Sequence, residues 1–233
     1  MNIYHFDKVD STNTVAMKMA KDKFPTPYII TADFQRCGKG KRNRIWHSQY
    51  KENLLMSVAL ECKKEVWLYS FISGIAVSKV LEKYGFHIKL KWVNDLILND
   101  KKLGGILCEI CTSEKSKTII IGIGINIFSS NLPEEIKDFA TSLTIEEPSL
   151  SLSIQNLAQE IAEEIIYLSK EDNIISMWKE KIWGIGKSVS IEIGENENLI
   201  VIKGIVSDIT DKGELKISCN GETKLISAGT IVY

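Results

Sequence analysis

Several classes of protein are excluded by what this sequence of 233 residues lacks. It contains no run near the roughly 20 consecutive apolar residues of a membrane span, and its first residues carry no apolar signal segment. Its five cysteines are odd in number and scattered, which favours the reduced setting of the cytoplasm over a disulfide framework. The 29 basic and 30 acidic residues nearly cancel to a formal net charge of -1, so no overall field attracts nucleic acid or a membrane.

Patterns typical of metal sites are also scarce. The three histidines lie far apart in the sequence and form no ligand spacing. Cys108 and Cys111 form a single C-x-x-C within residues 103–111, a segment whose composition predicts a β-strand. Because residues three apart in a strand point to opposite faces, we interpret these two cysteines as small strand hydrophobes.

The chain is long enough for one substantial domain with a small appendage. Apolar runs predict strands at residues 28–32, 54–60 and 119–127, and a helix is predicted at 66–84, ended by Gly85. Amphipathic periodicity predicts further helices at 152–168 and 174–183. From Gly186 onward the segments become short and alternating, with a tight-hairpin signal at Asn220-Gly221. We therefore predict one domain over residues 1–183 and a small β domain over residues 184–233.

Residues 36–44 are the most unusual stretch, with five cationic side chains and two glycines after a predicted strand. Glycine lets backbone N–H groups approach an anion, and cationic side chains donate charge-assisted hydrogen bonds to its oxygens. The spacing of Gly38 and Gly40 is not that of a Walker phosphate loop. A charged run can equally form a solvated loop. Gln35 before it and Trp46 after it favour a ligand site, because an amide and a flat apolar face suit a bicyclic ring.

Three further stretches carry polar groups where a ligand could bind. Residues 10–13 (DSTN) precede an amphipathic helix, where they could cap the helix or bind a polar ring at its N-terminus. Lys102 lies in the turn of a predicted hairpin beside Gly104-Gly105, and small residues inside a strand often mark the close approach of a ligand. Residues 122–126 (GIGIN) end a strand, and no helix opens after them, so a dinucleotide fold is not indicated.

Taken together, these stretches resemble the motifs of biotin protein ligases, nearly from one end of the chain to the other. Residues 10–13 resemble D-S-T-N, 38–46 resemble G-R-G-R-x-G-R-x-W, 91–95 resemble K-W-P-N-D, 102–107 resemble K-x-x-G-I-L and 122–126 resemble G-I-G-I-N. The departures are Lys39 and Lys41 for arginines, Asn43 for a glycine and Val93 for a proline. The two lysines keep the positive charge of the loop but lose the planar geometry of a guanidinium group.

This resemblance implies an α+β fold. The expected catalytic domain is a mixed β-sheet with helices packed on it, as in class II synthetases and biotin/lipoate ligases, followed by a small SH3-like β-barrel. Larger members of the family carry an N-terminal helix-turn-helix domain, whereas this chain begins at the first predicted strand. We therefore expect the short form, which binds no DNA and no membrane, and which could form a homodimer through a sheet edge.

The resemblance also implies an activity, that of a biotin-[acetyl-CoA-carboxylase] ligase. Such an enzyme uses ATP and Mg²⁺ to activate its substrate biotin as biotinyl-5'-AMP. It then transfers the biotinyl group to a lysine of the biotin carboxyl carrier domain of a biotin-dependent carboxylase. The chemistry needs no enzyme nucleophile, and we nominate none.

The residues implied to act are grouped by role. Lys41, Arg44 and Lys102 would be catalytic, because their charges offset the repulsion between two anions. Biotin would be bound by Ser11, Thr12, Asn13, Gln35, Gly38, Lys39, Gly40, Lys41 and Lys102. ATP and the adenylate would be bound by Lys41, Arg42, Arg44, Trp46, Asn94, Lys102 and Asn126. Asp95 is the candidate metal ligand, with Mg²⁺ held mainly through phosphates.

Two alternatives remain at this point. A lipoate or octanoate protein ligase would have a similar fold and chemistry, although the polar side chains at positions 11, 12, 13 and 35 suit a ureido ring better than a methylene chain. A nucleic-acid-binding module would bind phosphates with residues 36–44, the basic loop, and would use the small barrel as a platform. The near-neutral net charge counts against this second alternative.

Overall fold

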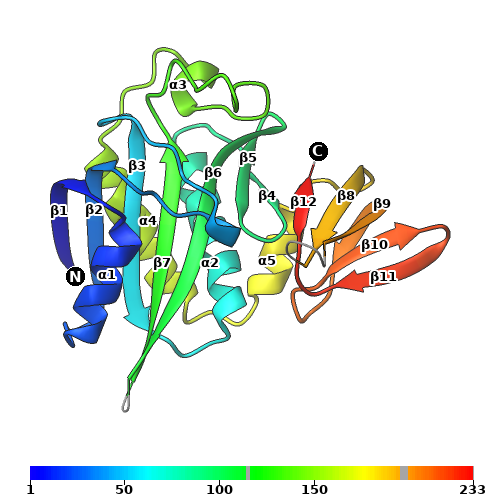
Figure 1. Cartoon of the computed structure of the whole chain (residues 1–233), viewed down its shortest axis with the longest axis horizontal. Helices are drawn as coiled ribbons and strands as arrows, with labels where there is room; N and C mark the ends of the chain where they lie inside the picture. The colour runs from blue at the N-terminus through cyan, green and yellow to red at the C-terminus, as the bar shows by residue number, and fades with distance from the viewer. Residues whose placement is uncertain (114–115, 195–198, 233) are drawn as a thin grey trace.

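The computed structural model describes residues 1–113, 116–194 and 199–232, and it contains two β-sheets (Figure 1). The larger sheet has seven strands in the order β1-β2-β3-β7-β6-β5-β4. Only β1 and β2 pair in parallel, so the sheet is mixed, as predicted. Its strands are β1 (Asn2–Val9), β2 (Tyr28–Gln35), β3 (Asn53–Glu61), β4 (Lys89–Lys91), β5 (Asp95–Leu98), β6 (Lys101–Thr112) and β7 (Lys117–Asn126).

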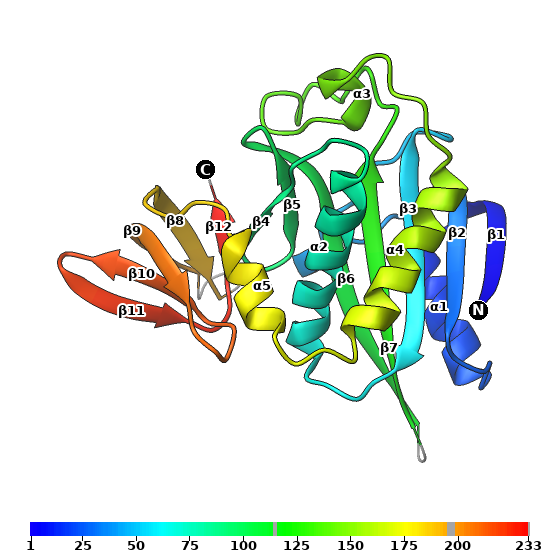
Figure 2. The same ribbon diagram turned by 180° about the vertical axis from the view of Figure 1, so that it is seen from behind.

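Helices cover both faces of this sheet. Helices α2 (Val66–Glu82) and α4 (Ile154–Leu168) lie on one face, and α1 (Thr12–Lys21) lies on the other (Figures 1 and 2). Helix α2 is apolar nearly all round and is buried along most of its length, as expected for a helix inside the core. It ends before Gly85, whose φ of 86° suits the residue that follows a helix. The remaining short helices are α3 (Leu143–Glu146), α5 (Ile174–Glu180) and the 3-10 turn η1 (Lys41–Asn43).

The C-terminal sheet is formed by the other five strands, which pair only in antiparallel fashion in the order β11-β10-β9-β8-β12. They are β8 (Ser188–Ile193), β9 (Ile200–Ile209), β10 (Leu215–Cys219), β11 (Glu222–Ile226) and β12 (Thr230–Val232). The predicted hairpin joins β10 to β11, where Asn220 and Gly221 have φ values of 50° and 84°. The short strands predicted after Gly186 therefore form a separate sheet.

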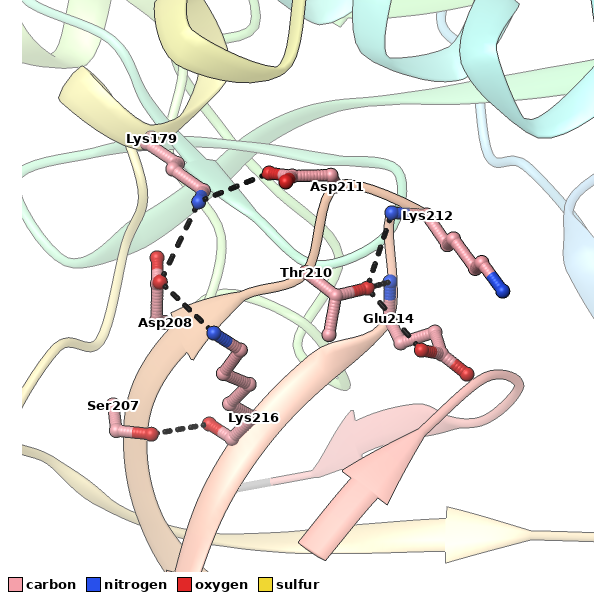
Figure 3. A network of polar contacts seen from close by, with 8 residues as sticks. All are labelled: Lys179, Ser207, Asp208, Thr210, Asp211, Lys212, Glu214 and Lys216. Carbon is pink, nitrogen blue, oxygen red and sulfur yellow. Dashed lines mark hydrogen bonds and ion pairs between the residues drawn. The ribbon is translucent and has the colours of Figure 1, made fainter. Parts of the chain in front are cut away.

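Buried and charged contacts fix the C-terminal sheet against the larger domain. The indole of Trp92 donates a 2.9 Å hydrogen bond to the carbonyl of Gly213. A Cβ on Gly213 would lie 2.5 Å from the ring of Trp67, so the turn packs closely. Around this contact, Lys179 of α5 lies 3.5 Å from Asp208 and 3.6 Å from Asp211 (Figure 3). The sheet thus has a defined orientation beside α5 and the β4–β5 hairpin.

Both cysteines of the C-x-x-C lie in β6, as the sequence predicts. Burial raises the pKa of the Cys108 thiol to about 12, so it stays protonated at neutral pH. Among the described residues, no helix is long and apolar enough to cross a membrane.

Candidate functional site

A cavity of about 270 Å³ opens on the face of the sheet that carries α1. It is lined by the start of α1, by strands β2, β3, β6 and β7, by the start of β5, by the basic loop, by part of residues 136–140 and by one residue of β12. Thirteen of the predicted site residues line it, which are Ser11, Thr12, Asn13, Gln35, Lys39, Gly40, Lys41, Arg44, Trp46, Asn94, Asp95, Lys102 and Asn126. Gly38 and Arg42 are not in the lining. The fold therefore brings motifs from distant parts of the sequence to one cavity.

Asn13 fixes the start of α1 across three adjacent strands. Its Oδ1 accepts a 2.6 Å hydrogen bond from Ser57 of β3, while its Nδ2 donates to the carbonyl of Leu107 at 3.3 Å and to Glu109 at 2.7 Å, both on β6. On β7, between these strands, a Cβ on Gly122 would lie only 2.2 Å from Asn13 Oδ1. The amide of Asn13 is thus occupied by the protein itself, which indicates that it positions the neighbouring residues.

Ser11 and Gln35 offer the hydrogen-bonding groups that remain. Gln35 Oε1 accepts from the backbone N–H of Thr12 at 2.8 Å and from its hydroxyl at 3.1 Å, which orients the Gln35 amide. Its Nε2 makes no hydrogen bond within the described chain. Ser11 is the N-cap of α1, yet its hydroxyl makes no capping bond although the residue is only 2% exposed. The hydroxyl of Ser11 and the amide N–H₂ of Gln35 are therefore available to bind a polar ligand.

Trp46 forms an apolar wall, and two glycines make room for it. A Cβ on Gly124 would lie 2.5 Å from the Trp46 ring, and one on Gly38 would lie 2.5 Å from the Trp46 carbonyl. The indole Nε1 is buried without a hydrogen-bond partner in the described chain. The glycine spacing of the 122–126 motif is therefore explained by Asn13 at its first glycine and by Trp46 at its second.

Three lysines gather around Asp95. Lys102 Nζ lies 2.7 Å from Asp95 Oδ1. Burial lowers the pKa of Lys41, and Asp95 opposes that shift. Burial likewise lowers the pKa of Lys91 to about 8, again opposed by Asp95, while Lys102 and Arg44 add to the lowering. An excess of positive charge in a partly desolvated site attracts a polyanion such as a nucleoside triphosphate. Sequence reasoning gave Lys91 no role, although it belongs to the 91–95 motif.

Asp95 and Asn94 offer limited oxygen ligation. The side-chain amide of Asn94 donates to the carbonyl of Ile106 at 2.9 Å, which holds it in place. Asp95 Oδ1 faces Lys102, so Oδ2 is the oxygen left for a cation. Within the described residues no group of three or more His, Cys, Asp or Glu side chains is placed to hold a metal ion. Mg²⁺ usually binds one or two carboxylates plus substrate phosphates, so Asp95 remains a prediction that fits this mode.

Asn126 ties the end of β7 to the following connection. Its Oδ1 accepts from Asn53 at 3.0 Å, and its Nδ2 donates to the carbonyl of Thr141 at 2.9 Å. The contact of Asn126 with an adenine ring stays a prediction. One N–H of the Asn126 amide is left to make it.

The side chains of the basic loop point in two directions. Lys41 and Arg44 line the cavity. Arg42 instead donates a 3.1 Å hydrogen bond to the carbonyl of Glu192 on β8, which the sequence gave no reason to expect. The prediction that Arg42 contacts ATP therefore has less support from its position than the predictions for its neighbours.

Comparison with known proteins finds relatives that are described as ligases. Residues 5–126 match the Biotin/lipoate A/B protein ligase family. The sequence is 36% identical over 149 residues to the bifunctional ligase/repressor BirA of Bacillus subtilis (strain 168), which covers 61% of this chain and 46% of that protein. It is 30% identical over 235 residues to BirA of Escherichia coli (strain K12), which covers 96% of this chain and 71% of that protein. The chain thus spans less than half the length of the Bacillus relative.

The solved structures include similar folds over the whole chain. The biotin protein ligase from Aquifex aeolicus in complex with biotin and ATP superposes with a TM-score of 0.81 and 27% sequence identity. That match covers 99% of this chain and 97% of the Aquifex chain.

Proposed function

Because the chain belongs to the biotin/lipoate A/B protein ligase family, we propose that it is an ATP-dependent biotin protein ligase. It activates biotin as biotinyl-5'-AMP and transfers the biotinyl group to a lysine of a biotin carboxyl carrier domain. The Aquifex structure with biotin and ATP supports this choice of substrates. The free cysteines of the chain fit a reaction in the cytoplasm.

The order of groups along β7 carries the proposal. Gly122, Gly124 and Asn126 are two residues apart, so they face the same side of the sheet. Gly122 adjoins the polar network of Asn13, Gly124 lies under Trp46 and pairs with Gly105 near Lys102, and Asn126 ends the strand. The cavity therefore presents a polar end, then an apolar and cationic middle, then a second amide. This is the order of ring, acyl phosphate and adenine in biotinyl-5'-AMP.

At the polar end, Ser11 and Gln35 discriminate between candidate acids. A ureido ring offers both a carbonyl and N–H groups, and it can pair with the Ser11 hydroxyl and the free Gln35 amide N–H₂. A dithiolane ring or a methylene chain would leave these buried groups unpaired, which typically costs about 1–3 kcal/mol for each group. Biotin is therefore favoured over lipoate and octanoate.

In the first step, a carboxylate oxygen of biotin attacks the α-phosphorus of ATP. The bond from that phosphorus to the bridging oxygen breaks, and pyrophosphate leaves with the electron pair. Lys102, Lys41 and Arg44 offset the charge of two anions that must meet. Mg²⁺, when bound, would add further positive charge at the phosphates, and Asp95 with Asn94 would hold it.

In the second step, the amine of the acceptor lysine attacks the acyl carbon of the adenylate. The bond from that carbon to the phosphate oxygen breaks, AMP leaves, and the amine loses a proton. The protein supplies no nucleophile for this step and acts by retaining and orienting the adenylate. Trp46 shields it with an apolar wall.

Incubation with ATP, biotin and a purified biotin carboxyl carrier domain tests the transfer. We expect the carrier domain to gain the mass of one biotinyl group at a single lysine. A carrier domain with that lysine replaced by arginine is the control and should gain nothing. A carrier domain that stays unmodified while adenylate accumulates would refute the proposed acceptor.

A homodimer is a further part of the proposal. Strand β1 lies at the edge of the seven-stranded sheet, and Ile3 and Phe6 on it are exposed. An edge strand with unpaired backbone groups is a ready surface for a second copy. Sedimentation of the purified protein at several concentrations tests this state.

A further inference from the structure

Glu192 of the C-terminal sheet contacts two arginines of the basic loop. Arg42 Nη2 donates to the backbone carbonyl of Glu192 at 3.1 Å, and Arg42 Nη1 lies 3.7 Å from Glu192 Oε2. Arg44 Nη2 lies 3.7 Å from the same carboxylate oxygen. In the ranges that the structure describes, Glu192 is the one carboxylate that pairs with either arginine. Two neighbouring cations of the loop therefore share one counterion from a distant part of the chain.

The backbone of the loop is shaped to make this contact. Arg42 has a φ of 54° and a ψ of 42°, in the left-handed region that arginine rarely adopts. This conformation lets Lys41 point into the cavity while the next residue, Arg42, points to β8. A residue in an unfavourable conformation persists only where surrounding contacts support it. The two contacts with Glu192 provide that support.

Glu192 is held in place by the strand beside it and by the docking of its sheet. Glu192 pairs across the sheet with Thr230 of β12, and Thr230 lines the cavity. The C-terminal sheet is fixed to the larger domain by Trp92 and by the network around Asp208 (Figure 3). The side chain of Glu192 is 25% exposed and that of Arg42 is 22% exposed. Such partly buried pairs are screened less by salt than pairs on an open surface.

We propose that Glu192 is a positioning residue of the adenylation site, through which the C-terminal sheet sets the geometry of the basic loop. By holding Arg42 outside the cavity and Arg44 at its edge, it fixes Lys41 and Arg44 where the phosphates of ATP bind. This inference rests on the proposed function. It assigns a catalytic contribution to the C-terminal sheet that the motifs do not contain.

The proposal predicts an effect on ATP and little effect on biotin. Removal of the carboxylate leaves the like charges of the loop unbalanced, so the loop leaves its place at the phosphates. The biotin ring is bound at the other end of the cavity, by Ser11 and Gln35. We expect Glu192→Ala to raise the KM for ATP in biotin-dependent pyrophosphate exchange roughly five- to tenfold, whereas the Kd for biotin changes less than about twofold.

A double-mutant cycle tests whether Glu192 acts through Arg42. Arg42→Ala should raise the KM for ATP by a similar factor, and the double variant should be little worse than either single variant, because the two residues act as a unit. Glu192→Gln, which keeps the size and one hydrogen-bonding oxygen, should have an intermediate effect. The matched control is Glu222→Ala, on strand β11 at the far edge of the same sheet, which should behave as the wild type.

Each outcome decides the matter. A raised KM for ATP that is not additive between Glu192 and Arg42, with an unchanged Kd for biotin, supports the proposal. An unchanged or lowered KM for ATP in Glu192→Ala overturns it, as does an equal weakening of ATP and biotin together with a lower Tm. If the wild type shows no biotin-dependent exchange at all, the proposed function fails instead, which separates the two conclusions.

Discussion

Lys102 Nζ lies 2.7 Å from Asp95 Oδ1, so the cation at the centre of the cavity already has a partner before any substrate binds. The two residues come from neighbouring strands, β6 and β5, whose pairing fixes their distance. Asp95 orients Lys102 through this ion pair, and its Oδ2 is the carboxylate oxygen left for a cation. A preorganised charge needs little rearrangement when a second anion arrives, which is the main way in which proteins stabilise charged transition states.

Lys102→Ala should slow adenylate formation severely while leaving the fold intact. Loss of one well-placed charge stabiliser costs about 3 kcal/mol of barrier, on the order of a hundredfold in rate. The measurement is biotin-dependent pyrophosphate exchange together with the Tm. Lys101→Ala, the exposed neighbour at the start of β6, is the matched control and should keep its activity. Near-normal exchange in the Lys102 variant would remove this residue from the reaction.

Gly122→Ala should disturb the site through Asn13. The added Cβ would lie 2.2 Å from Asn13 Oδ1, so the buried amide must leave its bonds to Ser57 and Glu109. Breaking such a network costs about 2 kcal/mol, which lowers the Tm by roughly 4–8 °C in a protein of this size. We also expect weaker binding of biotin by calorimetry, because Ser11 and Thr12 move with Asn13.

The control for that substitution is Gly105→Ala. There the nearest atoms to a new Cβ are 3.7 Å away, an ordinary contact, so its Tm should stay close to that of the wild type. Equal Tm values for the two alanine variants would mean that the amide of Asn13 does not need the space at Gly122.

Lys41→Gly should still form biotinyl-5'-AMP but release it. Lys41 lines the cavity, and its ammonium can grip the oxygens of the adenylate, while Lys102 and Arg44 remain to support the chemistry. A released acyl-adenylate reacts with any deprotonated amine. The measurement is biotin incorporation into albumin, with wild type and variant compared at matched adenylate production. Equal labelling would show that Lys41 does not retain the intermediate.

Lys91 should make the stability of the protein depend on pH in the alkaline range. Its pKa is about 8 in the folded protein against an ordinary value of 10.5, so between these values the unfolded chain binds more protons. The penalty of a buried charge, on the order of 3 kcal/mol, is therefore present below pH 8 and disappears as the pH rises towards 10.5.

Lys91→Met isolates this effect, because the other titrating groups remain in both proteins. The variant should be more stable than the wild type at pH 7 in urea unfolding, and the difference should shrink between pH 8 and pH 10. A difference that stays constant across this range would contradict a titrating Lys91.

The sequence predicts the residues of this site better than the contacts between them. Ser11 and Lys102 could be predicted because each lies in a local motif whose residue types suit the chemistry. Ser57 and Glu109 could not, since they are ordinary strand residues whose partner Asn13 is 44 and 96 positions away. Alternation along a strand predicts which face a side chain occupies, but not which distant residue it meets.

Arg42 shows a second limit of sequence reasoning. A cluster of cations predicts an anion site, and the sequence predicts that Lys39, Lys41, Arg42 and Arg44 all face the ligand. A single left-handed residue turns one side chain away from its neighbour, and the glutamate whose backbone carbonyl accepts its hydrogen bond lies 150 positions further on. Neither the backbone angle nor the docking of the second sheet is encoded in the spacing of the loop.

The most direct test of the proposed function is the exchange of labelled pyrophosphate into ATP, measured with biotin, lipoate, octanoate or no added acid. Exchange reports the first step alone, so it needs no knowledge of the acceptor protein. The order of groups along the cavity predicts exchange with biotin and only background exchange in the other three reactions. Exchange that depends on lipoate or octanoate but not on biotin, or no acid-dependent exchange at all, would contradict it.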